Sequence, residues 1–146
     1  MKFAVQRCCT TPAFLPQYDM SIDVVLDKLG VDTLDIKEFN CCGYPLKNIN
    51  LKAYLLASGR NMSLAQKHGT DIITFCNCCY GSLKHATQLM KEDKSIKSEI
   101  NETLMREDLT YDGKPSIRHF IDVLYRDIGV KEIKKRILRI SMVSFF

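Results

Sequence analysis

Short apolar runs alternate with longer amphipathic stretches along this chain. Lys2–Gln6 is a short apolar run, and Asp71–Phe75 is a β-branched one, so both predict buried strands. Thr33–Phe39 predicts a further strand between them. Each of the three predicted strands is followed within a few residues by cysteines.

Helical periodicity fills most of the remaining chain. Ser21 is a suitable N-cap for a helix that closes at Gly30, while the two prolines of Thr10–Gln17 predict a loop before it. A long amphipathic helix is predicted over Asn50–His68, with Gly59 as a point where it weakens or breaks. Further helices are predicted, in chain order, over Gly81–Lys91, Ile96–Asp108, Ser116–Asp127 and Val130–Ile140.

The order strand–helix–strand–helix–strand–helix predicts an α/β fold with a small, mainly parallel sheet and flanking helices. Parallel strands bring their carboxyl ends to one edge, and ligands of open α/β sheets bind outside that edge. The cysteines that follow the predicted strands should therefore meet there. The expected domain covers residues 1–139, and residues 140–146 form an apolar tail at an apparent truncation.

Composition describes one globular domain of 146 residues, 46% of them hydrophobic and 26% charged. A core of this size needs no disulfide framework, and no secretion signal is expected in the short segment before Arg7. The expected compartment is the cytoplasm, where thiols stay reduced. No apolar stretch reaches the roughly 20 residues that span a membrane.

The net charge of +4 has a local source near the C-terminus, in Lys131, Lys134, Lys135, Arg136 and Arg139. No aromatic residues interleave this run as a stacking platform for single-stranded nucleic acid would require. A solvated helix face is the favoured interpretation, so nucleic acid is not an expected partner.

The seven cysteines form three tight groups: Cys8–Cys9, Cys41–Cys42 and the Cys76-Asn77-Cys78-Cys79 run. Thirty-one residues separate Cys9 from Cys41, and thirty-three separate Cys42 from Cys76. Adjacent cysteines pair poorly because a disulfide needs a defined torsion, and the odd count argues against a complete set of disulfides. Thiolates gathered around zinc, Cu(I) or an iron–sulfur cluster fit the pattern better.

The spacing leaves the kind of metal open. Cys76 and Cys79 form a Cys-x-x-Cys pair, which serves metal sites and thioredoxin-like redox pairs alike. Cys41 and Cys42 reach one mononuclear site only if the backbone bends, which Gly43 would permit. A cluster with several irons accepts both thiolates more easily than one zinc ion, which usually takes four ligands.

The combined pattern resembles the cysteine-rich CCG domain found in the B subunit of heterodisulfide reductase. Its elements are Cys9, then Cys41-Cys42-Gly43, then Cys76-x-x-Cys79. The segments Arg60–Asn61, Gly69–Leu83, Ile117–Phe120 and Asp127–Gly129 also look like the first half of that protein. The resemblance covers roughly residues 2 to 139, and the combined motif is specific, whereas the Cys-x-x-Cys pair alone is not.

The resemblance implies a fold, a cofactor and a reaction. The B subunit holds a non-cubane [4Fe-4S] cluster in each of two such domains, and the corresponding ligands here are Cys9, Cys41, Cys42, Cys76 and Cys79. The family splits the mixed disulfide of coenzyme M and coenzyme B in methanogenesis. Electrons arrive through the A subunit, which carries flavin and iron–sulfur clusters, and through the C subunit, which carries iron–sulfur clusters. A disulfide takes two electrons, which paired one-electron clusters can deliver.

Two departures limit what the resemblance implies. Cys8 and Cys78 fall outside the family pattern, and inert buried thiols are favoured over alternative ligands. The sequence also offers one CCG domain where the family has two, so a truncated copy, or one half that pairs with a separate second half, is expected. The alternatives are a zinc-binding structural or interaction module, and a CCG-domain electron-transfer subunit of another oxidoreductase. His119 is a weak candidate for a proton donor; a satisfied polar residue at a helix start is favoured.

Overall fold

The computed structural model describes residues 2–136 and shows four parallel strands in the order β2-β1-β3-β4. The strands are β1 (Lys2–Gln6), β2 (Asp32–Leu34), β3 (Asp71–Thr74) and β4 (Ile117–His119). In register, Ala4 lies opposite Leu34 on one side and Ile72 on the other, and Thr74 lies opposite His119. The predicted α/β class with a small parallel sheet is confirmed.

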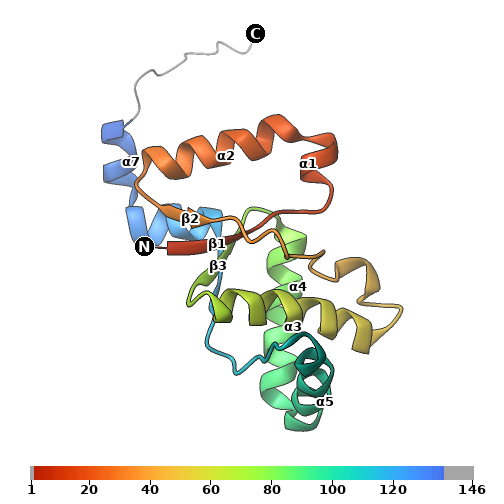
Figure 1. Cartoon of the computed structure of the whole chain (residues 1–146). Coiled ribbons are helices and arrows are strands. Elements are labelled where there is room, and N and C mark those ends of the chain that lie inside the picture. The colour runs from red at the N-terminus through yellow and green to blue at the C-terminus, as the bar shows by residue number, and fades with distance from the viewer. Residues whose placement is uncertain (1, 137–146) are drawn as a thin grey trace.

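Helices cover both faces of the sheet (Figure 1). The helices are α1 (Thr11–Phe14), α2 (Pro16–Lys28), α3 (Leu51–Lys67), α4 (Asn77–Glu92), α5 (Lys94–Leu104), α6 (Phe120–Asp122) and α7 (Val130–Arg136). Short 3-10 turns, η1 (Tyr44–Leu46) and η2 (Met105–Glu107), and a π-helical segment, η3 (Val123–Ile128), complete the described chain. In Figure 1, α2 and α7 lie above the sheet, whereas α3, α4 and α5 lie below it.

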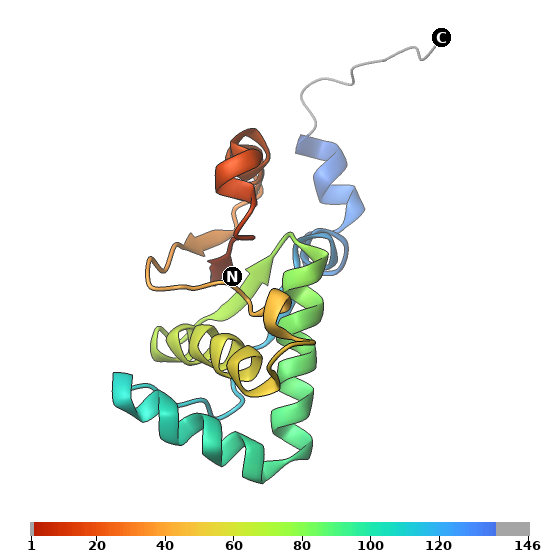
Figure 2. The ribbon, with the colours of Figure 1, turned by 90° about the vertical axis from the view of Figure 1, so that its right-hand side faces the viewer.

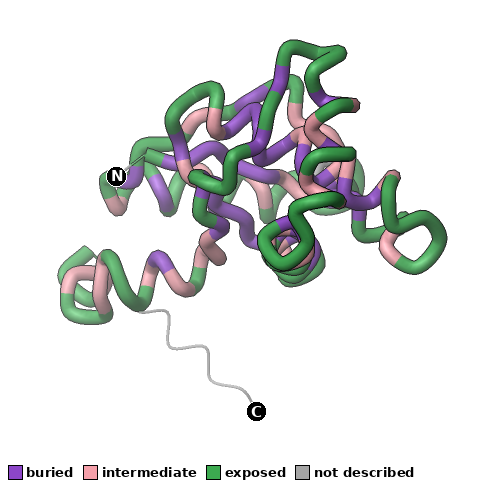
Figure 3. The backbone as a smooth tube through the Cα atoms, turned by 90° about the horizontal axis from the view of Figure 1, so that it is seen from below, coloured by how far each residue is buried: buried purple, intermediate pink, exposed green. Residues whose placement is uncertain are grey.

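Each face of the sheet has its own apolar core, because side chains alternate along a strand. Phe3 and Val5 face α2 and pack with Leu26 and Val123, whereas Ala4 faces α3 and α4. The larger core lies on the α3 side and includes the two buried cysteines, Cys42 and Cys79, along with Tyr54, Leu55, Met62, Ile72, Leu83, Met90 and Ile100. Buried segments run through the strands and the facing sides of the helices (Figure 3).

Several predicted elements differ from the structure. Ile117–His119 is a fourth strand and not part of a helix over Ser116–Asp127. It contains one strongly apolar residue, and it forms because β3 offers a free edge for pairing. The predicted loop over Thr10–Gln17 holds α1 and the start of α2, which begins at Pro16 and not after Ser21. Proline at the first helical position suits this start. The second strand ends at Leu34, well short of Phe39.

Two helices also begin or continue where the sequence predicts otherwise. Helix α4 starts at Asn77, directly after Cys76, and not at Gly81. Helix α3 passes through Gly59 without a break, and an ideal Cβ there would lie 3.1 Å from Ile100 Cγ2. The absent side chain therefore lets α5 pack closely against α3. Of the predicted last helix, Val130–Arg136 is observed; its remainder and the predicted tail, residues 140–146, lie outside the described residues.

Candidate metal centre

All three cysteine groups lie at the carboxyl edge of the sheet, as the strand order predicts. Cys8 and Cys9 follow β1, Cys41 and Cys42 lie in the loop between β2 and η1, and Cys76 is the N-cap of α4. The connections from β1 and β3 lead in opposite directions across the sheet, so a topological switch point lies between these strands. Open α/β sheets bind ligands at such a point.

The tightest group of thiols unites the first and third cysteine segments. The Sγ atoms of Cys8, Cys76 and Cys79 all lie within 4.8 Å of one another. Cys42 lies against Cys79 on one side and Cys41 on the other, and Cys9 contacts Cys41. Six cysteines therefore form one continuous set, and Cys78 is the remaining one, exposed on the first turn of α4.

Burial divides the six thiols into an inner and an outer part. Cys42 and Cys79 are buried, with 3% and 2% of their surface exposed, whereas Cys8, Cys41 and Cys76 are half-buried and Cys9 is exposed. A pocket of about 250 Å³ opens beside the outer part, between Cys8, Cys9 and Cys41. Neither Cys8 nor Cys78 is a buried thiol, contrary to the expectation for inert residues.

Neighbouring groups favour thiolate at some of these sulfurs. The hydrogen bond from the Cys79 thiol lowers the pKa of Cys42 to about 6 in spite of burial. Burial opposes ionisation of Cys8, but hydrogen bonds from Thr10 and Cys76 outweigh it and lower its pKa to about 7. Burial, followed by the nearby Cys41, raises the pKa of Cys9 to about 11. The hydrogen bond to Cys42, with burial, raises the pKa of Cys79, so this pair shares a proton between one thiol and one thiolate.

Backbone amides form a hydrogen bond to one sulfur in each cysteine segment. The bonds from Thr10 and Tyr44 help to lower the pKa of Cys8 and Cys42, whereas burial raises the pKa of Cys76 and the bond from Cys79 partly offsets it. The last of these amides belongs to the first turn of α4, where unpaired N–H groups and the helix dipole favour negative charge. Such hydrogen bonds stabilise thiolates and tune the potential of metal–sulfur centres.

The Cys41–Cys42 segment has an irregular backbone that is fixed by a sharp turn. Gly43 adopts a φ of +85°, and a Cβ at this position would lie 2.9 Å from the carbonyl oxygen of Tyr54. Only glycine fits this combination of left-handed backbone and close approach. The predicted bend at Gly43 is therefore present, and it places η1 beside the first turns of α4 (Figure 2).

A buried polar network holds the same loop against α3 and β1. Asn61, with 0% of its surface exposed, donates to Gln6 Oε1 at 2.7 Å and to the Asn40 carbonyl at 2.8 Å, and it accepts from the Asn40 N–H at 2.9 Å. Asn40 in turn donates to the Cys41 carbonyl at 2.7 Å, and Ser58 donates to the Cys42 carbonyl at 2.8 Å. The contacts to the backbone of Asn40, Cys41 and Cys42 fix the chain at the second cysteine group.

The Cys8–Cys9 segment is fixed by Arg7. Its guanidinium lies 2.6 Å from Asp19, 3.1 Å from Asp23 and 3.3 Å from Asp35. These ion pairs bind the end of β1 to α2 and to the segment after β2. Because three carboxylates surround one cation, this cluster adds no positive charge to the neighbouring cysteines.

Tyr54 approaches the inner thiols from α3 and contacts His85 of α4. The Tyr54 hydroxyl is buried, donates to the Ser82 carbonyl at 2.6 Å and lies 3.2 Å from His85 Nδ1. Burial, followed by the nearby Cys42, raises the pKa of Tyr54 to about 12, so its hydroxyl stays protonated. The Ser82 hydroxyl is buried beside Cys42 and helps to lower the pKa of that thiol.

His119 lies at the carboxyl end of β4, one strand beyond Cys76. Its Nδ1 accepts a hydrogen bond from Ile121 N–H at 3.3 Å, which matches the expected position at a helix start. Its ring packs edge-on against Tyr80, with centroids 5.6 Å apart, and Nε2 is buried with no partner among the described residues. Only one of the two ring nitrogens is therefore hydrogen-bonded within the described residues.

The donor set fits a sulfur-ligated metal group, since six thiols and three sulfur-facing amides converge on one edge. The sequence alone predicts that Cys9, Cys41, Cys42, Cys76 and Cys79 lie there together. It does not predict the position of Cys8, because adjacent cysteines look alike in a sequence. It also gives no signal for the roles of Asn40, Asn61 and Tyr54, for which helical spacing predicts only core or polar positions.

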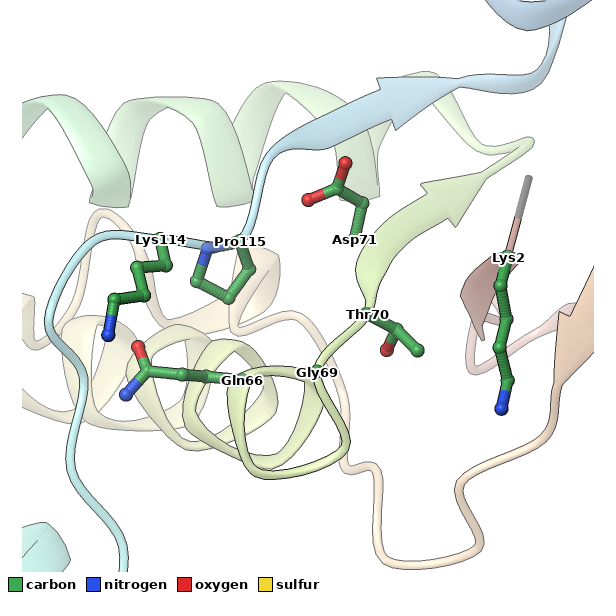
Figure 4. Close-up of a pocket in the computed structure, with 7 residues that line it drawn as sticks. All are labelled: Lys2, Gln66, Gly69, Thr70, Asp71, Lys114 and Pro115. Carbon is green, nitrogen blue, oxygen red and sulfur yellow. The ribbon is translucent and has the colours of Figure 1, made fainter.

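Another pocket lies at the opposite, amino-terminal edge of the sheet (Figure 4). It measures about 320 Å³ and contains no cysteine or histidine. Two of its charged side chains are already engaged, since Asp71 accepts from the Ser116 N–H at 2.8 Å and Lys114 pairs with Asp112 at 2.6 Å. The thiol edge is therefore the better candidate for chemistry.

Fold and site together define a doubly wound α/β domain with a cysteine-lined carboxyl edge. A sequence profile for the CCG family, described as a cysteine-rich domain, matches residues 3–84. The chain belongs to this family.

Two curated proteins with similar sequences are subunits of reductases. The B subunit of a ferredoxin/F(420)H(2)-dependent CoB-CoM heterodisulfide reductase from Methanosarcina acetivorans is 33% identical over 91% of this chain and 45% of the relative. The membrane anchor subunit of an 8-methylmenaquinol:fumarate reductase from Wolinella succinogenes is 27% identical over 99% of this chain and 51% of that protein. The chain thus spans about half the length of the curated relatives it matches.

A solved structure shares the fold. The crystal structure of a hypothetical protein from Helicobacter pylori superposes with a TM-score of 0.73 at 25% identity, covering 81% of this chain and 24% of that one. Within residues 2–136, none of the helices has the length and apolar character needed to cross a bilayer.

Proposed function

We propose that this chain is an iron–sulfur domain of an oxidoreductase, similar to the N-terminal half of the heterodisulfide reductase B subunit. The convergence of six thiols at the switch point between β1 and β3 carries this proposal. The proposed ligands are Cys9, Cys41, Cys42, Cys76 and Cys79, and the proposed group is a non-cubane [4Fe-4S] cluster. Membership of the CCG family and the identity to a heterodisulfide reductase relative support it.

When bound, such a cluster supplies one-electron chemistry at sulfur, with a disulfide such as that of coenzyme M and coenzyme B as the proposed substrate. The residues of this chain position and protect that chemistry. The polar network of Asn40 and Asn61 holds the Cys41–Cys42 backbone, and the α3 core keeps water from Cys42 and Cys79. His119 is proposed to hold a proton at Nε2 for a leaving thiolate.

The proposed assembly is a reductase of several subunits, which the subunit names of the relatives support. Partners that resemble the flavin-containing A and iron–sulfur C subunits of heterodisulfide reductase would bring electrons, and a separate second CCG half would complete the pair of sites. Residues 1–139 form the proposed domain, and its proposed location is the cytoplasm. Complete cleavage of a disulfide would need more than this domain, because the chain spans less than half of the heterodisulfide reductase relative.

A second candidate is a zinc-binding structural module. Three sulfurs within 4.8 Å, with Cys42 beside them, amount to the four thiolates of a structural zinc site. A third candidate, an electron-transfer subunit of a different oxidoreductase, gains support from the fumarate reductase relative. This third candidate uses the same cluster and differs in substrate.

Metal analysis separates these candidates. The full chain is purified without oxygen and reconstituted with iron and sulfide, and iron, acid-labile sulfide and zinc are measured per chain. Bound iron and sulfide with an electron paramagnetic resonance signal support the proposal; stoichiometric zinc without iron overturns it. Cys42→Ser should abolish the signal, whereas Cys78→Ser, at an exposed position outside the set, should preserve it. A signal that survives Cys42→Ser would refute the ligand assignment.

A further inference from the structure

Cys8 stands outside the CCG pattern, which uses Cys9 as the cysteine of the first segment. The structure nevertheless groups Cys8, and not Cys9, with the Cys-x-x-Cys pair: the sulfurs of Cys8, Cys76 and Cys79 lie within 4.8 Å of one another. Thiolates around one tetrahedral metal ion lie about 3.8 Å apart when each metal–sulfur bond is about 2.3 Å. Small side-chain rotations would bring these three sulfurs to that spacing.

Local backbone geometry gives Cys8 the same support as two proposed ligands. The Thr10 N–H faces the Cys8 sulfur, as the Tyr44 N–H faces Cys42 and the Cys79 N–H faces Cys76. The Thr10 hydroxyl lies 3.2 Å from the same sulfur. The neighbours with the largest influence on the Cys9 thiol are the cysteines Cys41, Cys8 and Cys42. The first cysteine segment thus turns Cys8 inward and leaves Cys9 exposed.

We propose that Cys8 is a metal ligand of this site, bound on the Cys76–Cys79 side, while Cys9 serves the Cys41 side. This inference rests on the proposed function because both concern the same metal centre. The ligand role of Cys8 does not require an iron–sulfur cluster, so any metal ion that binds thiolates can test it. Cys8 and Cys9 then bind on different sides of the site. Side chains of neighbouring residues point in different directions, so these two cannot both face Cys76. Cys8 and Cys9 both line the pocket that Cys41 also lines.

Cadmium titration tests the role of Cys8 without requiring a cluster. The reduced, metal-free full chain is titrated with Cd²⁺ while the ultraviolet thiolate-to-cadmium charge-transfer band is followed. Loss of groups that merely orient ligands lowers metal affinity about 10- to 100-fold, so Cys8→Ser should weaken Cd²⁺ binding by at least about tenfold. Cys78→Ser is the matched control and should leave the affinity unchanged, since Cys78 is exposed and outside the set.

Cys8→Ala serves as a second variant, and far-ultraviolet circular dichroism confirms that each variant is folded. Wild-type affinity in folded Cys8→Ser and Cys8→Ala, with a loss in Cys9→Ser, would overturn the assignment. Iron–sulfur reconstitution separates the two proposals. A wild-type chain that binds Cd²⁺ through Cys8 but takes up no iron contradicts the proposed function alone. A wild-type chain that takes up iron and sulfide, together with variants lacking Cys8 that keep full Cd²⁺ affinity, contradicts the role of Cys8 alone.

Discussion

The Cys41–Cys42 loop and the Cys76–Cys79 turn deliver thiols to the same site by different physical means. The Cys76–Cys79 turn is the start of a helix, so its backbone is fixed by local hydrogen bonds such as the one from Tyr80 N–H to the Cys76 carbonyl at 2.9 Å. The Cys41–Cys42 loop has no regular structure up to η1 and is fixed by side chains from β1 and α3. Regular structure supplies its own backbone partners, whereas an irregular loop needs dedicated polar groups.

This difference means that the two segments should respond differently to mutation. The loop depends on residues that lie 16 to 34 positions away along the chain, whereas the turn should tolerate changes at its exposed positions. The following substitutions compare the two, beginning with the largest expected effect on the free energy of unfolding.

Asn61→Ala should be the most damaging change. It removes three hydrogen bonds and leaves buried groups of Gln6 and Asn40 unpaired, at an expected cost of about 3–5 kcal/mol. Urea denaturation measures this cost, and the Cd²⁺ affinity should fall with it because the Cys41–Cys42 backbone is released. Asn77→Ala, at an exposed position of the α4 turn, is the control and should stay within about 0.5 kcal/mol of wild type.

Gly43→Ala should destabilise the loop by about 2–3 kcal/mol, because a left-handed backbone and a close contact with Tyr54 act together. Gly30→Ala isolates the backbone part of this cost. Gly30 also has a positive φ, of 72°, but a Cβ there meets nothing within 4 Å, so about 1 kcal/mol is expected. If thermal or urea denaturation gives the same loss of stability for Gly43→Ala and Gly30→Ala, the close contact with Tyr54 adds nothing to the cost at Gly43.

Ser58→Ala removes the hydrogen bond to the Cys42 carbonyl and should cost about 1 kcal/mol of stability. Ser63→Ala is a matched change in the same helix, at another buried serine. Its hydroxyl bonds only to the Gly59 carbonyl one turn back, a contact of little net value, so the change in stability should be close to zero. If the two variants unfold at the same urea concentration, Ser58 does not fix the loop.

Gly81→Ala should slightly stabilise the chain. Gly81 lies inside α4, and an added Cβ meets nothing within 4 Å, so helix propensity predicts a gain of about 0.5–1 kcal/mol. Calorimetry should show a higher Tm with unchanged Cd²⁺ affinity. A lower Tm would mean that the α4 turn is as sensitive as the Cys41–Cys42 loop, which would remove the contrast between them.

Much of the architecture follows from local patterns. The predicted bounds of β1 match the observed ones, since a short run of consecutive apolar residues fits a buried strand better than a helix or a loop. The predicted bounds of α3 are also close, because Asn50 caps the helix with a 3.0 Å bond from Ala53 N–H and Gly69 follows its end. In contrast, the three residues of β4 carry no strand pattern, and pairing with β3 alone makes them a strand.

The sequence by itself determined the class of fold and the convergence of cysteines at one sheet edge. The apolar runs that predict strands and the periodicity that predicts helices are local properties of the sequence. Parallel strands then bring the carboxyl ends of distant segments to one edge. Only the tertiary structure decided which of two adjacent cysteines faces Cys76, and which polar residues hold the Cys41–Cys42 loop. The direction of a single side chain depends on backbone torsions and on packing from α2 and α3, and no spacing along the chain encodes it.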